Sequence, residues 1–234
     1  MSPQPLVWDI SIQRQLRQGA ARFQLDVRLA SAAQRLVLHG PSGAGKTQTL
    51  RVIAGIDRPD AGRVEVAGTL MLDVSGGLHL SPQERRLPVV FQEYALFPHL
   101  TVRQNIAFAT RRGWRNPGQD LDDEQVERWI EAFRLQAVVS LKPHQLSGGQ
   151  RQRTALARAL MTGPRALLLD EPFTAVDAPL RRHLREELLA LQAELALPML
   201  LITHDDEDVR HFAQDVVELA EGRVAQSPPA DGGA

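Results

Sequence analysis

Several kinds of residue and segment are missing from this chain of 234 residues, and each absence excludes a class of protein. There is no cysteine, which rules out disulfide bonds and thiolate metal sites and fits a reducing compartment. The longest apolar stretch, residues 195–202, contains Pro198 and is far shorter than the roughly 20 residues that cross a bilayer. The first residues show no basic segment followed by an apolar run, so we expect no export signal. A role at a membrane would therefore require another chain.

An excess of charge of one sign is missing as well. The formal net charge is -1, so no global field favours nucleic acid, and we expect no nucleic-acid partner. Hydrophobic residues make up 43% of the chain and charged residues 24%, close to the average of globular proteins. The length suits one domain with a sizeable core and room for a subdomain.

Strand patterns alternate with helix patterns along much of the chain. The polar stretch 14–22 is expected to join the first two strands as a hairpin loop. This order predicts an α/β fold whose parallel sheet is covered by helices on both faces. Strands are expected at residues 6–12, 23–29, 35–39, 63–72, 87–91, 166–169 and 199–203, and helices at 46–54, 121–139, 148–161 and 179–195.

A largely helical block, residues 93–162, interrupts the alternation and is expected to be an inserted helical subdomain. The core of the domain is then formed by residues 1–92 and 163–226, and its N-terminal strands form an antiparallel β subdomain. The last residues, 227–234, are expected to be a disordered tail.

A glycine-rich segment lies between the strand expected at 35–39 and the helix expected at 46–54. It matches the phosphate-binding pattern G-x-x-x-x-G-K-[ST], in which glycines let backbone N–H groups turn towards an anion at a helix N-terminus. Lys46 is expected to reach the β- and γ-phosphates, and the Thr47 hydroxyl to bind Mg²⁺. The alternative is a glycine-rich turn without a ligand. The expected nucleotide-binding residues here are Gly40, Pro41, Ser42, Gly43, Ala44, Gly45, Lys46, Thr47 and Gln48.

Two adjacent acids, Asp170 and Glu171, end the apolar strand expected at 166–169. An acid after a buried strand is costly unless it is paired or functional. Asp170 is expected to hold Mg²⁺, directly or through water, and Glu171 to act as general base towards the attacking water. The alternative is a pair of ordinary turn or helix-capping acids.

Two further polar residues follow strands. His204 comes after residues 199–203 and is expected to contact the γ-phosphate and to hold Glu171 and the water, although a lone histidine is more often structural. Gln92 comes after residues 87–91, where a glutamine can touch Mg²⁺ or water.

A second candidate anion site begins the helix expected at 148–161. Small residues at a helix N-terminus leave several N–H groups free. Because one nucleotide does not need two such sites from one chain, we expect the second to bind the γ-phosphate held by another copy, in a head-to-tail dimer that shares two ATP molecules. The alternative is a helix capped by Ser147. The segment consists of Leu146, Ser147, Gly148, Gly149 and Gln150.

With these segments in this order, the chain resembles the nucleotide-binding subunits of ABC transporters from Leu6 to about Val224. The resemblance implies a P-loop NTPase core of the RecA-like type, ATP and Mg²⁺ as ligands, and ATP hydrolysis coupled to transport. It also implies a hinge role for Gln92 and a switch role for His204. Residues 174–177 are similar to the loop that couples the two sites of the dimer, which places Asp177 among the nucleotide-binding residues.

Within the family, residues 80–86 and 90–100 are similar to bacterial importers of oxyanions, sugars and iron, most of all to the molybdate-importer group. This implies permease subunits in the membrane that contact residues 94–100, an external substrate-binding protein that acts indirectly, and a peripheral location on the cytoplasmic face of the inner membrane. Members of the group often carry a further C-terminal β-domain, and none is expected here. The alternatives are another substrate, such as sulfate, iron, polyamine or sugar, an exporter, or an ABC ATPase that acts on ribosomes or DNA.

One departure from the family concerns the nucleotide base. The family stacks adenine on an aromatic residue in the loop before the second strand, but residues 14–22 contain no aromatic side chain. Phe23 is adjacent and is expected to point into the sheet. We therefore expect loose purine specificity.

Overall fold

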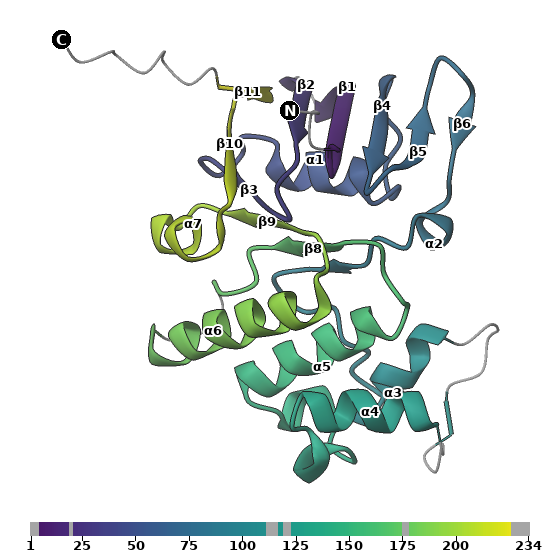
Figure 1. Ribbon diagram of the computed structural model, residues 1–234, viewed down its shortest axis with the longest axis vertical. Helices are drawn as coiled ribbons and strands as arrows, with labels where there is room; N and C mark the ends of the chain where they lie inside the picture. Colours follow the sequence, from purple (N-terminus) through teal and green to yellow (C-terminus); the bar gives the residue numbers. More distant parts are fainter. Residues whose placement is uncertain (1–4, 19–20, 111–116, 119–122, 175–177, 226–234) are drawn as a thin grey trace.

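The computed structural model describes residues 5–18, 21–110, 117–118, 123–174 and 178–225. Within these residues the strands form one eleven-stranded sheet with the order β6-β5-β4-β1-β2-β11-β10-β3-β9-β8-β7. The part from β6 to β2 is antiparallel, and the part from β10 to β7 is parallel (Figure 1). The expected α/β fold is therefore confirmed.

The N-terminal hairpin is longer than expected. β1 (Trp8–Gln18) pairs with β2 (Ala21–Ser31) from Trp8 opposite Ser31 to Gln18 opposite Ala21. The expected loop at 14–22 is thus mostly strand, and that prediction was wrong. Polar side chains do not prevent pairing here, because the ladder is made by the backbone and only one face of an antiparallel ribbon has to be covered.

The single strand expected at 63–72 is a hairpin of β4 (Ala61–Val66) and β5 (Thr69–Asp73), and β6 (Leu78–His79) pairs with β5. Ala67 and Gly68 form the turn with φ values of 48° and 71°. A two-residue hairpin turn of type I′ requires positive φ at both positions, and glycine at the second makes this inexpensive. The alternation of apolar residues on both sides of the turn concealed it in the sequence.

The central parallel strands are buried on both faces. They are β3 (Arg35–His39), β8 (Leu167–Asp170) and β9 (Met199–Thr203), and they are flanked by β7 (Val89–Val90) and β10 (Asp215–Ala220), with β11 (Arg223–Val224) next to β10. Since alternate side chains point to opposite faces, each strand contributes to two cores. One core contains Leu36, Leu38, Leu168, Leu200 and Ile202, and the other contains Val37, Leu167, Leu169 and Leu201.

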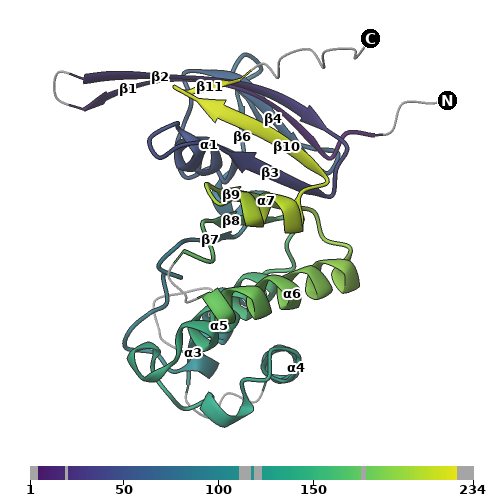
Figure 2. The ribbon, with the colours of Figure 1, turned by 90° about the vertical axis from the view of Figure 1, so that its left-hand side faces the viewer.

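The helices cover these two faces. α1 (Lys46–Ile53) lies between the β1–β2 hairpin and the parallel strands (Figure 2), and its apolar residues belong to the first core. The second core is covered by α3 (Val102–Ala107), α4 (Glu124–Ala132), α5 (Gly148–Leu160) and α6 (Ala178–Leu195). Two short helices, α2 (Pro82–Arg85) and α7 (Asp206–Phe212), complete the fold.

The helix expected at 121–139 is shorter in the structure. α4 ends at Ala132, where Arg134 adopts a φ of 51°, and a short 3₁₀ turn at Gln136–Val138 follows. The apolar periodicity continues across this break because Phe133, Leu135 and Val138 still face the core.

The described part of residues 93–162 contains helices and no strand. Its apolar residues, among them Ile106, Ile130 and Leu156, pack in the same cluster as Val37 and Leu169 of the parallel sheet. The helical block therefore shares a core with the sheet, and its status as a separate subdomain stays a prediction.

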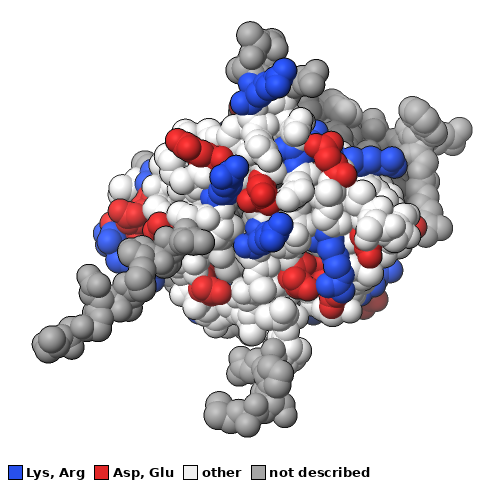
Figure 3. Space-filling view, turned by 90° about the horizontal axis from the view of Figure 1, so that it is seen from above, with Lys and Arg blue, Asp and Glu red and all other residues white. Residues whose placement is uncertain are grey.

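No helix in the described part of the chain is long and apolar enough to cross a membrane. On the face seen in Figure 3, basic and acidic side chains of the described residues are interspersed, which agrees with the balanced net charge.

Candidate active site

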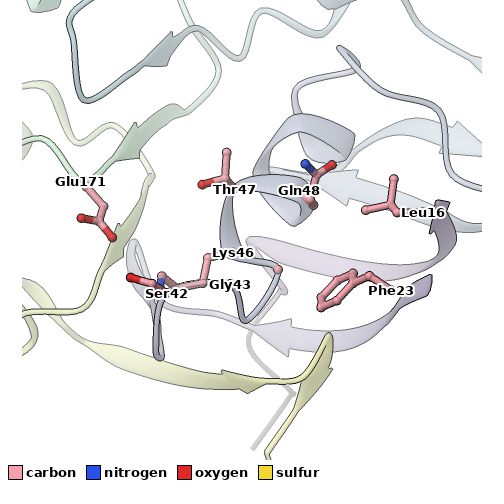
Figure 4. Close-up of a pocket in the computed structure, with 9 residues that line it drawn as sticks. Leu16, Phe23, Ser42, Gly43, Lys46, Thr47, Gln48 and Glu171 are labelled. Carbon is pink, nitrogen blue, oxygen red and sulfur yellow. The ribbon is translucent and has the colours of Figure 1, made fainter. Parts of the chain in front are cut away.

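A cavity of about 500 Å³ opens beside the carboxyl ends of the parallel strands (Figure 4). This edge of an open α/β sheet is where such folds bind ligands. The segment after β3, the start of α1, the residue after β8 and the far end of the β1–β2 hairpin all reach it. It is lined by Leu16, Phe23, Ser42, Gly43, Gly45, Lys46, Thr47, Gln48 and Glu171.

The glycine-rich loop has a backbone that only glycine allows at two positions. Gly40 has a φ of 149°, and a Cβ atom there would lie 2.1 Å from the carbonyl oxygen of Leu219. Gly45 has a φ of 100° and occupies the N-cap position of α1, where no side chain caps the helix. The N–H groups of the first turn are thus left without a capping side chain, which suits an anion in the cavity.

Lys46 is buried and reaches back over the loop. Its Nζ donates hydrogen bonds to the carbonyl oxygens of Gly40 at 2.6 Å and Pro41 at 2.9 Å. Burial lowers the pKa of this ammonium group, although the charges of Glu171 and Asp170 act in the opposite direction. The positive charge of Lys46 is therefore not fully balanced by the nearby acids, and this suits a side chain that binds a phosphate group.

Asp170 ends β8, and its Oδ1 accepts a hydrogen bond of 3.2 Å from the Thr47 hydroxyl. Burial raises the pKa of this carboxyl group, and the charge of Glu171 adds to the effect, whereas Thr47 and Lys46 oppose it. A hydroxyl and a carboxylate short of positive charge are suitable ligands for Mg²⁺.

Among the described residues, no group of three or more histidine or acidic side chains is placed to hold a metal ion. This is compatible with Mg²⁺, which takes one or two carboxylates from a protein and its other ligands from phosphates and water.

Glu171 and His204 meet where β8 and β9 end. Nδ1 of His204 lies 2.8 Å from Oε2 of Glu171, and the Thr174 hydroxyl donates to the same oxygen at 3.0 Å. The backbone N–H of Glu171 donates to the carbonyl oxygen of Ile202, and Glu171 adopts a φ of 48°. A non-glycine residue in this conformation is uncommon and is enriched at functional sites. The structure thus gathers Lys46, Thr47, Asp170, Glu171 and His204 at one edge.

Other expected site residues do not line this cavity. Gln92 is exposed beyond the end of β7. Ser147 caps α5: its hydroxyl accepts from the N–H of Gln150, and its own N–H donates to Oε1 of Gln150 at 2.8 Å. Gly148 and Gly149 form the first turn of that helix. Asp177 lies outside the described residues.

The sequence interpretation missed a hydrophobic side of the cavity. Leu16 and Phe23 stand opposite each other on β1 and β2 and therefore share a face. Phe23 lies on the face of the buried Leu25 and packs against the first core, as expected. The same side chain also lines the cavity beside Gly45, so an aromatic ring borders the cavity, and loose purine specificity stays a prediction. The signal was the spacing of Phe23 two residues before Leu25.

Comparisons with known proteins agree with this geometry. The family model described as ABC transporter matches residues 25–174. The sulfate/thiosulfate import ATP-binding protein CysA of Vibrio vulnificus is 45% identical over 193 residues, which cover 82% of this chain and 54% of the relative. The spermidine/putrescine import ATP-binding protein PotA of Escherichia coli K12 is 41% identical over 203 residues, which cover 87% of this chain and 51% of the relative. The molybdenum import ATP-binding protein ModC of Rhodospirillum rubrum is 38% identical over 224 residues, which cover 94% of this chain and 58% of the relative.

The chain thus spans about half the length of the curated relatives that it matches. Among solved structures, a dimeric bacterial ABC transporter cassette, MJ0796, has a TM-score of 0.75 and 27% identity, covering 94% of this chain and 97% of its own. A dimeric post-hydrolysis state of the same cassette bound to ADP and Pi gives a TM-score of 0.74. On the family match, the chain belongs to the ABC transporter family, and the curated relatives named above are ATP-binding proteins of importers.

Proposed function

We propose that this protein binds ATP with Mg²⁺ and hydrolyses it to drive a bacterial importer. The observation that carries the proposal is the convergence of Lys46, Thr47, Asp170, Glu171 and His204 on one edge of the sheet, beside an uncapped helix N-terminus. Each group has a task in phosphoryl transfer to water.

The residues divide this work between binding and proton transfer. Lys46 and the backbone N–H groups after Gly45 hold the phosphates, and Phe23 with Leu16 offers an apolar wall to the base. Glu171 orients the attacking water and accepts its proton, while His204 fixes the carboxylate. Thr47 and Asp170 would hold Mg²⁺, which when bound neutralises charge on the phosphates. Positioning and electrostatic stabilisation supply most of the rate enhancement.

The active form in this proposal is a head-to-tail homodimer. Ser147, Gly148, Gly149 and Gln150 start α5 away from the cavity of their own chain and would close on the γ-phosphate bound by the partner. Gln92 and Asp177 are proposed to complete the site when the dimer closes. The dimeric state of the similar cassette MJ0796 supports this arrangement.

A permease subunit is the proposed membrane partner, and the chain would sit peripherally on the cytoplasmic face of the inner membrane. A groove of about 620 Å³ runs between the end of α1, α2, β7 and the end of α5. Its apolar residues include Ile56, Leu87, Pro88, Phe91 and Met161. A short helix from the permease would fit such a surface. The expected contact segment 94–100 is partly core, since Tyr94 and Leu100 are buried.

For the transported solute, we propose an oxyanion, with molybdate first and sulfate, iron, polyamine or sugar as alternatives. The two relatives named for molybdenum and sulfate support an oxyanion, and the relative named for spermidine and putrescine supports a polyamine. The permease and an external binding protein would select the solute.

The test of hydrolysis compares the wild type with Glu171→Gln and with Glu131→Gln, an exposed acid on α4. We expect Glu171→Gln to bind ATP normally but to hydrolyse it about 10²- to 10⁴-fold more slowly, because the general base is lost. It should also elute as a dimer when ATP is present. A wild-type rate in Glu171→Gln would refute the assignment of the base, and Glu131→Gln should behave as the wild type.

The test of import uses the chain reconstituted with its permease in vesicles. ATPase activity is measured after addition of binding protein loaded with molybdate, sulfate or a polyamine. Stimulation by one loaded form identifies the solute. Co-purification with ribosomes or DNA, and no stimulation, would instead favour an ABC ATPase outside transport.

A further inference from the structure

A partly buried ionic cluster lies next to the candidate active site, between α6 and the start of α7. We define this Arg185 cluster by Arg185 on α6 and by Thr203, Asp205, Glu207 and Asp208 at the end of β9 and the start of α7. The Arg185 side chain is only 3% exposed. None of the functions proposed above uses this cluster.

All three nitrogens of the Arg185 guanidinium group donate hydrogen bonds to carboxylate oxygens. Nε donates to Oδ1 of Asp208 at 2.7 Å, Nη1 to Oε2 of Glu207 at 2.7 Å, and Nη2 to Oδ2 of Asp205 at 3.0 Å. Burial lowers the pKa of Arg185, but the hydrogen bonds with Glu207 and Asp208 and the charges of Asp208 and Asp205 together raise the pKa above its ordinary value. The planar fork of an arginine can serve three acceptors in fixed directions, which a lysine ammonium cannot do.

The cluster holds both neighbours of His204. Oδ2 of Asp208 accepts from the Thr203 hydroxyl at 2.6 Å, and the backbone N–H of Asp205 donates to that same hydroxyl at 3.0 Å. His204 stands between Thr203 and Asp205 in the chain, so the direction in which its side chain leaves the backbone is set by these bonds.

The cluster also touches the segment that carries Glu171. The guanidinium carbon of Arg185 lies 5.9 Å from the centroid of the Phe173 ring, within cation–π range, and Phe173 is two residues after Glu171. Phe173 stacks on Phe212 at the end of α7, with ring centroids 5.6 Å apart. One side chain therefore contacts both loops whose tips meet in the His204–Glu171 pair.

We propose that Arg185 is a positioning residue that sets His204 against Glu171 and thereby the rate of hydrolysis. This deepens the proposed ATPase function and rests on it. Arg185 does not line the cavity, so its loss should lower kcat and leave the KM for ATP nearly unchanged. A displacement of about 1 Å in a catalytic group can cost about 100-fold in rate.

The first experiment compares Arg185→Lys with Arg182→Lys, an exposed arginine on the same helix. We expect Arg185→Lys to lower kcat by about 10- to 100-fold with KM changed by less than about threefold. The imidazole nitrogen signals of His204, assigned by their absence in His204→Ala, should shift in Arg185→Lys and stay unchanged in Arg182→Lys. Unchanged His204 signals or an unchanged kcat would overturn the proposal.

A second measurement separates positioning from general support of the fold. If Arg185 acts through His204, then Arg185→Lys should change the single-turnover rate little when His204 is already alanine. An equal loss in both backgrounds would overturn the proposal. Where the rate of His204→Ala is too low to measure, the imidazole signals decide.

The proposal can still be tested if Arg185→Lys does not fold or if the wild type does not hydrolyse ATP. If Arg185→Lys does not fold, Asp205→Asn takes its place, because asparagine still caps α7 while the charged contact with Arg185 is lost. It should shift the same His204 signals and lower kcat. If the wild type does not hydrolyse ATP, the proposed function fails, but the signals of His204 in the variants still test its link to Arg185.

Discussion

The cavity beside Lys46 and the Arg185 cluster both hold charged side chains near the ends of β8 and β9, but their electrostatic states are opposite. In the cluster, hydrogen bonds raise the pKa of Arg185, and contacts with Arg185 lower the pKa of Glu207. At the cavity, burial lowers the pKa of Lys46 and raises that of Asp170. Charges in the first group stabilise each other, and those in the second are under-compensated.

This difference distinguishes the charges of the Arg185 cluster, which stabilise the fold, from the charges at the cavity, which are suited to bind a charged ligand. A folded chain keeps poorly compensated buried charges mainly where a ligand or a reaction uses them. In the proposed function, Mg²⁺ and the phosphates of ATP carry the charges that would balance Asp170 and Lys46. Substitutions in the cluster should therefore affect stability as well as the position of His204, whereas substitutions at the cavity should affect mainly binding.

The largest expected effect is on stability. Arg185→Met should lower the free energy of unfolding by about 3–5 kcal/mol, because it leaves the buried carboxylate of Asp208 without its cation. Arg182→Met, at an exposed position, should change it by less than about 0.5 kcal/mol. Urea unfolding measures both, and equal values for the two variants would remove the distinction between cluster and surface.

Lys46→Met should show the opposite pattern. We expect affinity for ATP to fall by about 100-fold, as charge-assisted bonds to phosphate are lost, while the free energy of unfolding changes by less than about 1 kcal/mol. Titration with a fluorescent ATP analogue and urea unfolding give the two numbers. A large loss of stability with intact binding would place Lys46 with the structural charges instead.

Phe23→Ala tests the apolar wall of the cavity. Stacking of a base on an aromatic ring contributes about 1–3 kcal/mol, so affinity for ATP should fall about 10-fold. Phe23→Leu serves as the matched control, because it keeps an apolar side chain at this position of the cavity wall but offers no ring. If both variants bind ATP like the wild type, the base does not rest on this side chain.

The smallest expected effect is a pH dependence. The pKa of Asp170 is raised above its ordinary value of 3.8, so the folded state holds this proton more tightly than the unfolded state. Its contribution to stability is then present below about pH 3.8 and is lost as the pH rises through the raised pKa. In the absence of nucleotide, Asp170→Asn should remove this loss in unfolding curves measured between pH 4 and 7. An identical pH profile would contradict the shift.

The sequence predicted the phosphate loop and the acid pair because both are continuous segments at strand ends, and carboxyl ends of parallel strands meet at one edge. The place of Phe23 at the cavity was missed because it depends on the pairing of β1 with β2, which brings Leu16 opposite it. Arg185 has the appearance of a solvated charge on a helix, and its partners come from a segment about 20 residues later. Contacts of this kind depend on the packing of α6 against α7, which periodicity does not report.

The double role of β3, β8 and β9 has a mechanical consequence. Their alternate side chains pack in one core around α1 and in another beneath α3 to α6. A shift of the helices on either face of the sheet would therefore strain the same three strands. Force from a helix on one side would therefore reach the residues at the carboxyl edge directly. The three strands therefore form a rigid connection between the two cores, and the residues of the candidate active site lie at its carboxyl edge.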